Sequence, residues 1–248
     1  MRLRNVVFAA AAPLLLSSDI AAAQESARSI KFGILAGMSM SDFTAPDLST
    51  ALLDASGVDK RRRKGGQIGG FITFPMGRYF ALQPEMHYVK KGVIFEFTGE
   101  GNLPGEDPEP LPSGAEASLQ LAYLEIPLLA RVDLGSPDAE VKPFILAGPT
   151  IALRAACQFG FEVAQFNAQF QCDENNETLE LEEGLDPVRK VDYGVMFGGG
   201  VAIRLFGLPA SLQARYSRSL ASIAKAQGGV EAPDVRNTAI SLLIGIGF

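Results

Sequence analysis

The 248-residue sequence contains no tryptophan, one histidine and two cysteines. Because His87 is the only histidine, a catalytic triad or a histidine general base would have to be built around it. The sequence also lacks a G-x-S-x-G motif, which would mark a serine nucleophile. We therefore interpret His87 as a structural histidine bonded to a carboxylate, and we expect no catalysis, no cofactor and no metal site.

Long hydrophobic runs are missing as well. Beyond residue 23 there is no stretch of eighteen or more apolar residues, so no helix is long enough to span a bilayer. The formal net charge of −6 argues against a nucleic-acid binder, which needs a basic face. Hydrophobic residues nevertheless make up 47% of the chain, and 26 residues are glycine. We therefore expect the apolar residues and glycines to lie in β-strands rather than in membrane-spanning helices.

The N-terminus has the three parts of a secretory signal peptide. Arg2 and Arg4 precede an apolar run over residues 6–16, and three alanines end at Ala23. Pro13 interrupts the run, which disfavours a permanent membrane anchor. We expect Sec-dependent export with cleavage after Ala23, leaving residues 24–248 as one domain.

Export favours a disulfide between Cys157 and Cys172, because exported proteins fold in an oxidising compartment. Closing a loop of about 15 residues stabilises by roughly 3 kcal/mol; two free buried thiols are the alternative. No histidine or second cysteine pair lies nearby, so metal ligation is not expected. The intervening segment is dense in aromatic residues, which fits a hairpin extended beyond a membrane or an adhesive tip. These residues are Phe159, Phe161, Phe166 and Phe170.

Apolar residues alternate with small or polar ones along several segments, with the period of two that is typical of strands. In residues 238–248 one face carries Ile240, Leu242 and Ile244, while the other carries Ser241 and Gly245. Residues 191–205 show an apolar row opposite a row of glycine, alanine and isolated charges. Small residues with few ions suit a narrow barrel lumen, so we place the apolar rows outside, against lipid.

Eight segments show this alternation, and the connections between them are alternately long and short. The predicted strands are residues 30–41, 66–74, 79–90, 119–132, 142–154, 191–205, 210–220 and 238–248. Short periplasmic turns, long outer loops and both termini inside describe an outer-membrane barrel. The sequence thus predicts an all-β, eight-stranded antiparallel up-and-down transmembrane β-barrel. A soluble lipocalin-like barrel is the competing fold.

The segment L-Q-P-E-M-H-Y-V-K-K-G at residues 82–92 resembles the PorT-type, or porin-family, outer-membrane β-barrel domain. The stretches F-G-I-L-A-G at 32–37, Y-L-E-I-P-L-L at 123–129 and K-P-F-I-L-A-G-P at 142–149 agree with it. The resemblance implies an integral protein of the bacterial outer membrane. It also implies recognition by the barrel-assembly machinery through a C-terminal signal at Ile244, Ile246 and Phe248.

Charged residues on the lumen side of the strands predict an internal ion-pair network, because charges inside a small barrel must be paired. The interior of an eight-stranded barrel is about filled by side chains, so we expect little or no pore. The predicted members are Glu85, His87, Glu125, Arg131, Arg204 and Arg215.

A basic run lies in what we expect to be the first outer loop. Arginine binds phosphate bidentately, so this run could contact lipopolysaccharide. Alternatively it pairs with acidic loop residues around 106–109 and 173–183. Its members are Lys60, Arg61, Arg62, Arg63 and Lys64.

We expect a structural, surface-binding or export-complex role without catalysis. A narrow porin for small solutes and a lipid-modifying enzyme are the alternatives. The expected partners are outer-membrane lipid and lipopolysaccharide, the barrel-assembly machinery and an unidentified envelope protein.

Overall fold

The structure, a computed structural model, describes residues 30–44, 58–97, 114–136, 139–163, 166–172, 188–224 and 234–248. These residues form nine β-strands. The strands are β1 (Lys31–Thr44), β2 (Val58–Pro75), β3 (Phe80–Phe97), β4 (Ala115–Asp133), β5 (Lys142–Val163), β6 (Phe166–Gln171), β7 (Val191–Leu205), β8 (Leu208–Ser219) and β9 (Arg236–Gly247). The described residues contain no helix long and apolar enough to cross a membrane.

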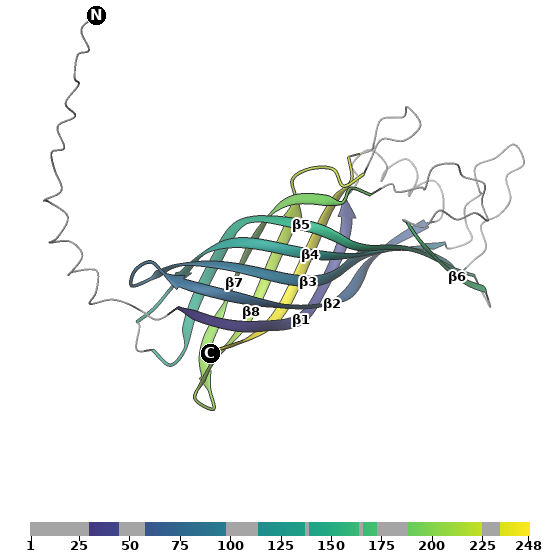
Figure 1. The fold of residues 1–248 in the computed structure, drawn as a ribbon. Helices are drawn as coiled ribbons and strands as arrows, with labels where there is room; N and C mark the ends of the chain where they lie inside the picture. The colour runs from purple at the N-terminus through teal and green to yellow at the C-terminus, as the bar shows by residue number, and fades with distance from the viewer. Residues whose placement is uncertain are drawn as a thin grey trace, which may run out of the picture.

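Eight of these strands close into an antiparallel barrel (Figure 1). Neighbours in sequence pair with each other, β5 pairs directly with β7, and β1 pairs with β9 to close the ring. Strand β6 pairs only with the outer end of β5 and lies outside the barrel. The predicted fold is therefore confirmed, with one additional short strand in the third long connection.

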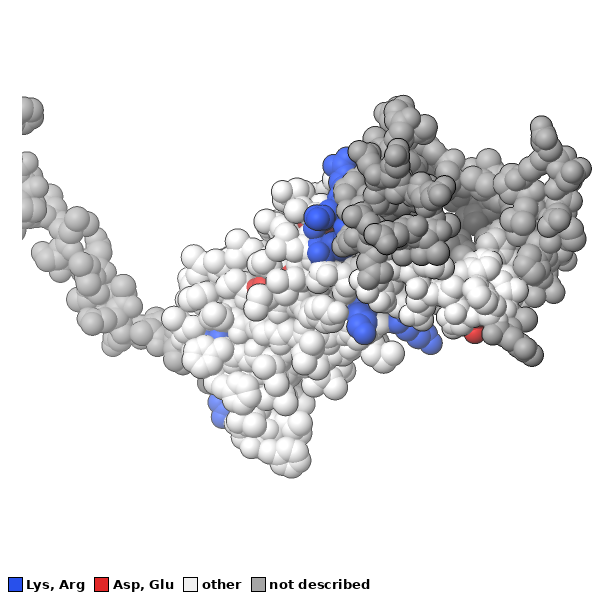
Figure 2. All heavy atoms as spheres, turned by 45° about the vertical axis from the view of Figure 1, so that its right-hand side comes forward, with Lys and Arg blue, Asp and Glu red and all other residues white. Residues whose placement is uncertain are grey.

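The outer wall of the barrel is apolar. On paired strands, Ile34 faces Ile246 and Ala36 faces Ile244, and Ile34 and Ile244 are 55% and 61% exposed. Residues of the opposite parity, such as Leu35 and Leu243, are fully buried inside. On the face shown in Figure 2 the wall is mostly uncharged, and lysine and arginine lie toward its ends. This alternation is the one predicted for a barrel that contacts lipid.

Several strands are longer than predicted, mainly at the end that carries the long connections. β3 continues to Phe97, β5 to Val163, and β2 begins at Val58. These extensions pair with one another beyond the closed ring, on the right of Figure 1. The prediction that residues 60–64 lie in a loop was therefore wrong: they belong to β2.

The extension reverses the polarity of the alternation. On one face, Val93 pairs with Leu119, and Leu119 with Phe159, in continuity with the barrel interior. On the other face, Glu96 pairs with Glu116. Below the reversal the outside is apolar, and above it the outside is polar. A reversal of this kind is expected where a barrel wall passes from lipid into water.

Candidate functional site

A buried ion cluster occupies the middle of the lumen. Arg215 of β8 donates from Nη1 and Nη2 to the two carboxylate oxygens of Glu85 on β3, at 2.5 and 3.0 Å. His87 Nε2 lies 2.5 Å from Glu85 Oε2. All three side chains are buried. The structure thus brings together three of the predicted lumen residues.

Amide side chains complete this cluster. Gln83 donates to Glu85 at 2.5 Å, and Gln213 accepts from Arg215 Nε at 3.1 Å. When His87 Nε2 donates to Glu85, its Nδ1 accepts from Gln67 Nε2 at 3.3 Å. Both ring nitrogens of His87 are therefore engaged inside the barrel wall. The imidazole ring of His87 is thus buried and hydrogen-bonded to Glu85 and Gln67.

A second buried pair lies nearby. Lys91 Nζ is 2.5 Å from Glu125 and 3.4 Å from the hydroxyl oxygen of Ser217. Lys91 was absent from the predicted network because the third strand was expected to end at residue 90. Asp192 accepts a hydrogen bond from Ser219 farther along the lumen.

Apolar layers fill the lumen on both sides of these polar groups. The layer toward the outer ends of the strands contains Phe43, Val89, Val93, Leu121, Tyr123, Ala152, Cys157, Cys172, Val188 and Ile223. The layer toward the short turns contains Leu129, Phe144, Leu146 and Met196. A solute crossing the barrel would meet the outer apolar layer, the buried ion pairs of Glu85 and Glu125, and the inner apolar layer.

Glycines on β7 make room for this filling. A Cβ at Gly198 would lie 2.9 Å from Arg215 Cγ and 3.0 Å from Leu146 Cδ1. At Gly200 it would lie 2.9 Å from Phe144 Cζ and 2.3 Å from the Leu212 carbonyl oxygen. The lumen-facing glycines are thus sites where large neighbours occupy the space of a side chain.

The remaining two predicted lumen residues lie at the short-turn end. Arg131 bonds Asp133 at 2.9 Å, and its guanidinium stacks 3.7 Å from the ring centroid of Phe144. Arg204 has the predicted lumen phase but is exposed, because β7 ends there at the open rim. Its assignment to the buried network was wrong.

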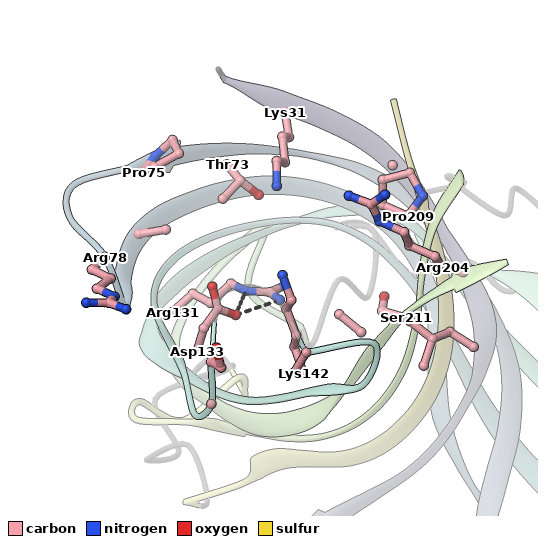
Figure 3. Close-up of a pocket in the computed structure, with 18 of the residues that line it drawn as sticks. Lys31, Thr73, Pro75, Arg78, Arg131, Asp133, Lys142, Arg204, Pro209 and Ser211 are labelled. Carbon is pink, nitrogen blue, oxygen red and sulfur yellow. Dashed lines mark hydrogen bonds and ion pairs between the residues drawn. The ribbon is translucent and has the colours of Figure 1, made fainter. Parts of the chain in front are cut away.

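Both arginines line a cavity of about 430 Å³ at this end of the barrel (Figure 3). Lys31, Arg78 and Lys142 line it too, together with Asp133. We call this cavity the vestibule. Arg131 lines the vestibule, and the Phe144 ring on which it stacks belongs to the inner apolar layer of the lumen.

The basic run divides between two environments on β2. Lys60 binds Asp42 at 3.1 Å, and Arg61 binds Glu96 at 2.7 Å and Glu116 at 3.8 Å. The hydrogen bond and charge of Glu96 raise the pKa of Arg61. These two cations are therefore paired within the sheet. The acidic loop residues proposed as their partners lie outside the described residues.

The other members of the run are placed differently. Lys64 pairs across from outward-facing Met40 and is exposed, as is Arg62. Lys90 is exposed on the adjacent strand, two residues beyond outward-facing Tyr88. Arg63 is half-buried, and its side chain approaches Gly92. Lys64 and Lys90 thus place two neighbouring positive charges at the edge of the apolar wall, on the side of the long connections.

Cys157 and Cys172 form the predicted disulfide, with their Cα atoms 5.3 Å apart. It ties β5 to the end of β6, and both cysteines pack in the outer apolar layer. Phe159 pairs with Phe170 on the hairpin, and the two rings are 37% and 47% exposed. The aromatic segment therefore forms a hairpin beyond the barrel, and the exposed rings leave the adhesive role open.

The C-terminal strand runs to the short-turn end. Phe248 donates its backbone N–H to the Phe32 carbonyl at 2.7 Å, and its side chain is 62% exposed. Ile244 is exposed on the outer wall, and Ile246 pairs with Ile34 on the same face. The expected signal peptide, residues 1–23, lies outside the described residues. No group of three metal-ligating side chains occurs within the described ranges.

Comparison with solved structures finds small outer-membrane barrels. The attachment invasion locus protein Ail of Yersinia pestis, in complex with sucrose octasulfate, is 10% identical over 89% of this chain and 99% of its own, with a TM-score of 0.39. OprG from Pseudomonas aeruginosa is 12% identical over 88% and 95%, with a TM-score of 0.42. The outer membrane enzyme PagL is 11% identical over 88% and 99%, with a TM-score of 0.32.

A search of curated proteins found no match. The family of the outer membrane protein beta-barrel domain matches residues 22–225, which is most of the chain. The closed ring and its apolar outer wall agree with that match. The chain therefore belongs to the outer membrane protein beta-barrel domain family and is an integral protein of the bacterial outer membrane.

Proposed function

We propose that this protein is a closed, non-catalytic barrel that anchors a binding surface at the outside of the cell. The observation that carries the proposal is the combination of a filled lumen with a sheet that continues past the rim. A channel needs a continuous polar path, and a lipid-modifying enzyme needs a reactive side chain open to lipid. The apolar layers in the lumen disfavour a channel. The burial of the His87 ring disfavours a lipid-modifying enzyme.

The binding surface is the apolar face of the extended sheet. Phe159 and Phe170 remain substantially exposed although the disulfide holds their hairpin in place. Exposed aromatic side chains on a rigid support lose little conformational entropy on binding. The face therefore suits contact with an apolar surface on another cell-envelope or extracellular protein.

Adhesion of cells to polystyrene beads tests this proposal. Cells producing the protein should bind beads more than cells producing a Phe159→Gln/Phe170→Gln variant. Exposed outward-facing Gln169 provides a matched control, because Gln169→Asn leaves the apolar face intact. Equal adhesion of wild type and the phenylalanine variant, at equal surface amounts, would refute the proposed binding surface.

We also propose lipopolysaccharide and the barrel-assembly machinery as partners, and a PorT-type identity within the family. Lipopolysaccharide binding is supported by Lys64 and Lys90, which are exposed at the edge of the apolar wall on the side of the long connections. Recognition by the barrel-assembly machinery is supported by Ile244 and the terminal Phe248, whose side chains are exposed. The PorT-type identity rests on the motif at residues 82–92, which supplies Glu85 and His87 to the lumen cluster.

A further inference from the structure

The vestibule differs in charge from the chain as a whole. The chain has a formal net charge of −6, yet the described residues that line the vestibule include five basic and two acidic side chains. These are Lys31, Arg78, Arg131, Lys142 and Arg204, against Asp133 and Glu140. A surplus of positive charge inside a cavity with low-dielectric walls concentrates the field and attracts anions.

The cations approach the vestibule from separate elements. Lys31 begins β1, Arg78 lies in the β2–β3 turn, and Lys142 begins β5. Arg204 comes from the end of β7, across the opening from Arg78 in Figure 3. Cations arranged around one opening can contact several anionic groups of a single ligand. Arg204 makes no ion pair with the described residues and is the most available of them.

The vestibule also has the size and mixed lining of a ligand site. About 430 Å³ lies within the range of small-molecule pockets. Phe71, Phe80 and Ile203 supply apolar wall, and Thr73 and Ser211 supply hydroxyl groups. Arg131 lies at its inner end and is held in place by Asp133 and Phe144.

We propose that the vestibule binds a small soluble polyanion, carrying phosphate or carboxylate groups, from the periplasmic side. The short turns place this opening in the periplasm. Arginine and lysine recognise phosphate and carboxylate by charge-assisted hydrogen bonds, and arginine does so bidentately. This site is independent of the outer binding surface, since the filled lumen separates the two.

Calorimetric titration of the purified full chain with pyrophosphate and with citrate, at low ionic strength, tests the inference. Arg204→Ala/Lys142→Ala should weaken binding of the preferred anion at least tenfold. Lys190→Ala/Arg218→Ala removes the same charge from exposed positions at the other end of the barrel and should leave binding unchanged. Glu140→Gln should tighten it. Migration on unheated gels reports whether each variant remains folded.

The outcomes separate specific binding from general charge effects. Failure of both anions to bind, or equal weakening by the two double variants, would overturn the inference. Phosphatidylglycerol in lipid nanodiscs tests the other source of phosphate. If it abolished pyrophosphate binding, the site would belong to a lipid headgroup, and the assignment to a soluble ligand would be wrong. Equal affinity in phosphatidylcholine and phosphatidylglycerol nanodiscs supports the assignment.

Discussion

Arg215 and Glu85 face each other across the lumen and form a two-point ion pair between β8 and β3, strands that are not neighbours in the barrel. Breaking a buried pair on one side leaves an uncompensated charge and costs about 3–5 kcal/mol. Arg215→Met should therefore lower the free energy of unfolding by about that amount. Because the chain has no tryptophan to report unfolding by fluorescence, the free energy of unfolding is measured on unheated gels, as the loss of the fast-migrating folded band with increasing urea.

The double variant Glu85→Leu/Arg215→Met is the control for this pair. Because neither charge remains, it should be more stable than either single variant. If the two single losses simply added in the double variant, the side chains would not be coupled as the structure indicates.

The glycine row of β7 gives a second prediction. Gly200→Val should reduce the yield of folded barrel severely, because its Cβ would meet the Leu212 carbonyl and the Phe144 ring. Gly66→Val is the matched control on β2, since a Cβ there meets nothing within 4 Å. Densitometry of folded and unfolded bands compares them. Equal yields would show that the lumen has more free space than described.

The disulfide holds the outer hairpin, whose second strand β6 lies outside the ring of eight strands. Cys157→Ser/Cys172→Ser should make the β5–β6 hairpin susceptible to protease, because a bridge across 15 residues contributes about 3 kcal/mol. The folded barrel band should persist, since eight strands close without β6. Protease treatment of whole cells followed by electrophoresis checks both statements. A barrel that fails to fold without the bridge would contradict them.

Lipopolysaccharide binding should depend on Lys64 and Lys90. A cation near an anionic membrane surface contributes about 1 kcal/mol, or roughly fivefold in affinity. Lys64→Ala/Lys90→Ala should weaken binding accordingly, and salt should reduce the difference. Arg61→Ala should have a smaller effect, because Glu96 and Glu116 already neutralise its charge. Surface plasmon resonance at two salt concentrations compares them, and equal losses would argue against this contact.

The sequence predicts the barrel because lipid and lumen impose opposite demands on alternate residues. Strand β7 shows this best: its predicted and observed bounds agree, since the apolar row opposite glycines runs over its whole length. The outer extensions escape the same reasoning because their polarity reverses above the membrane. Apolar Val93 and Phe95 face inward there, and an outward apolar row no longer marks the strand.

The sequence predicts which residues belong to the lumen cluster. It does not predict which of them form pairs. Strand phase places Glu85, His87 and Arg215 inside, but phase alone does not tell which of them meet across the barrel. It also cannot distinguish the middle of the lumen from its rim, which is why Arg204 was misassigned. Lys91 was missed with the extension of β3 that carries it.

Conductance of the purified protein in planar bilayers tests the closed barrel most directly. Two apolar layers and the buried ion pairs Arg215–Glu85 and Lys91–Glu125 should allow no steady current. The result predicted is an absence of channel openings from wild-type protein whose folding and insertion are verified on the same sample. A steady, large and reproducible open channel would contradict the account.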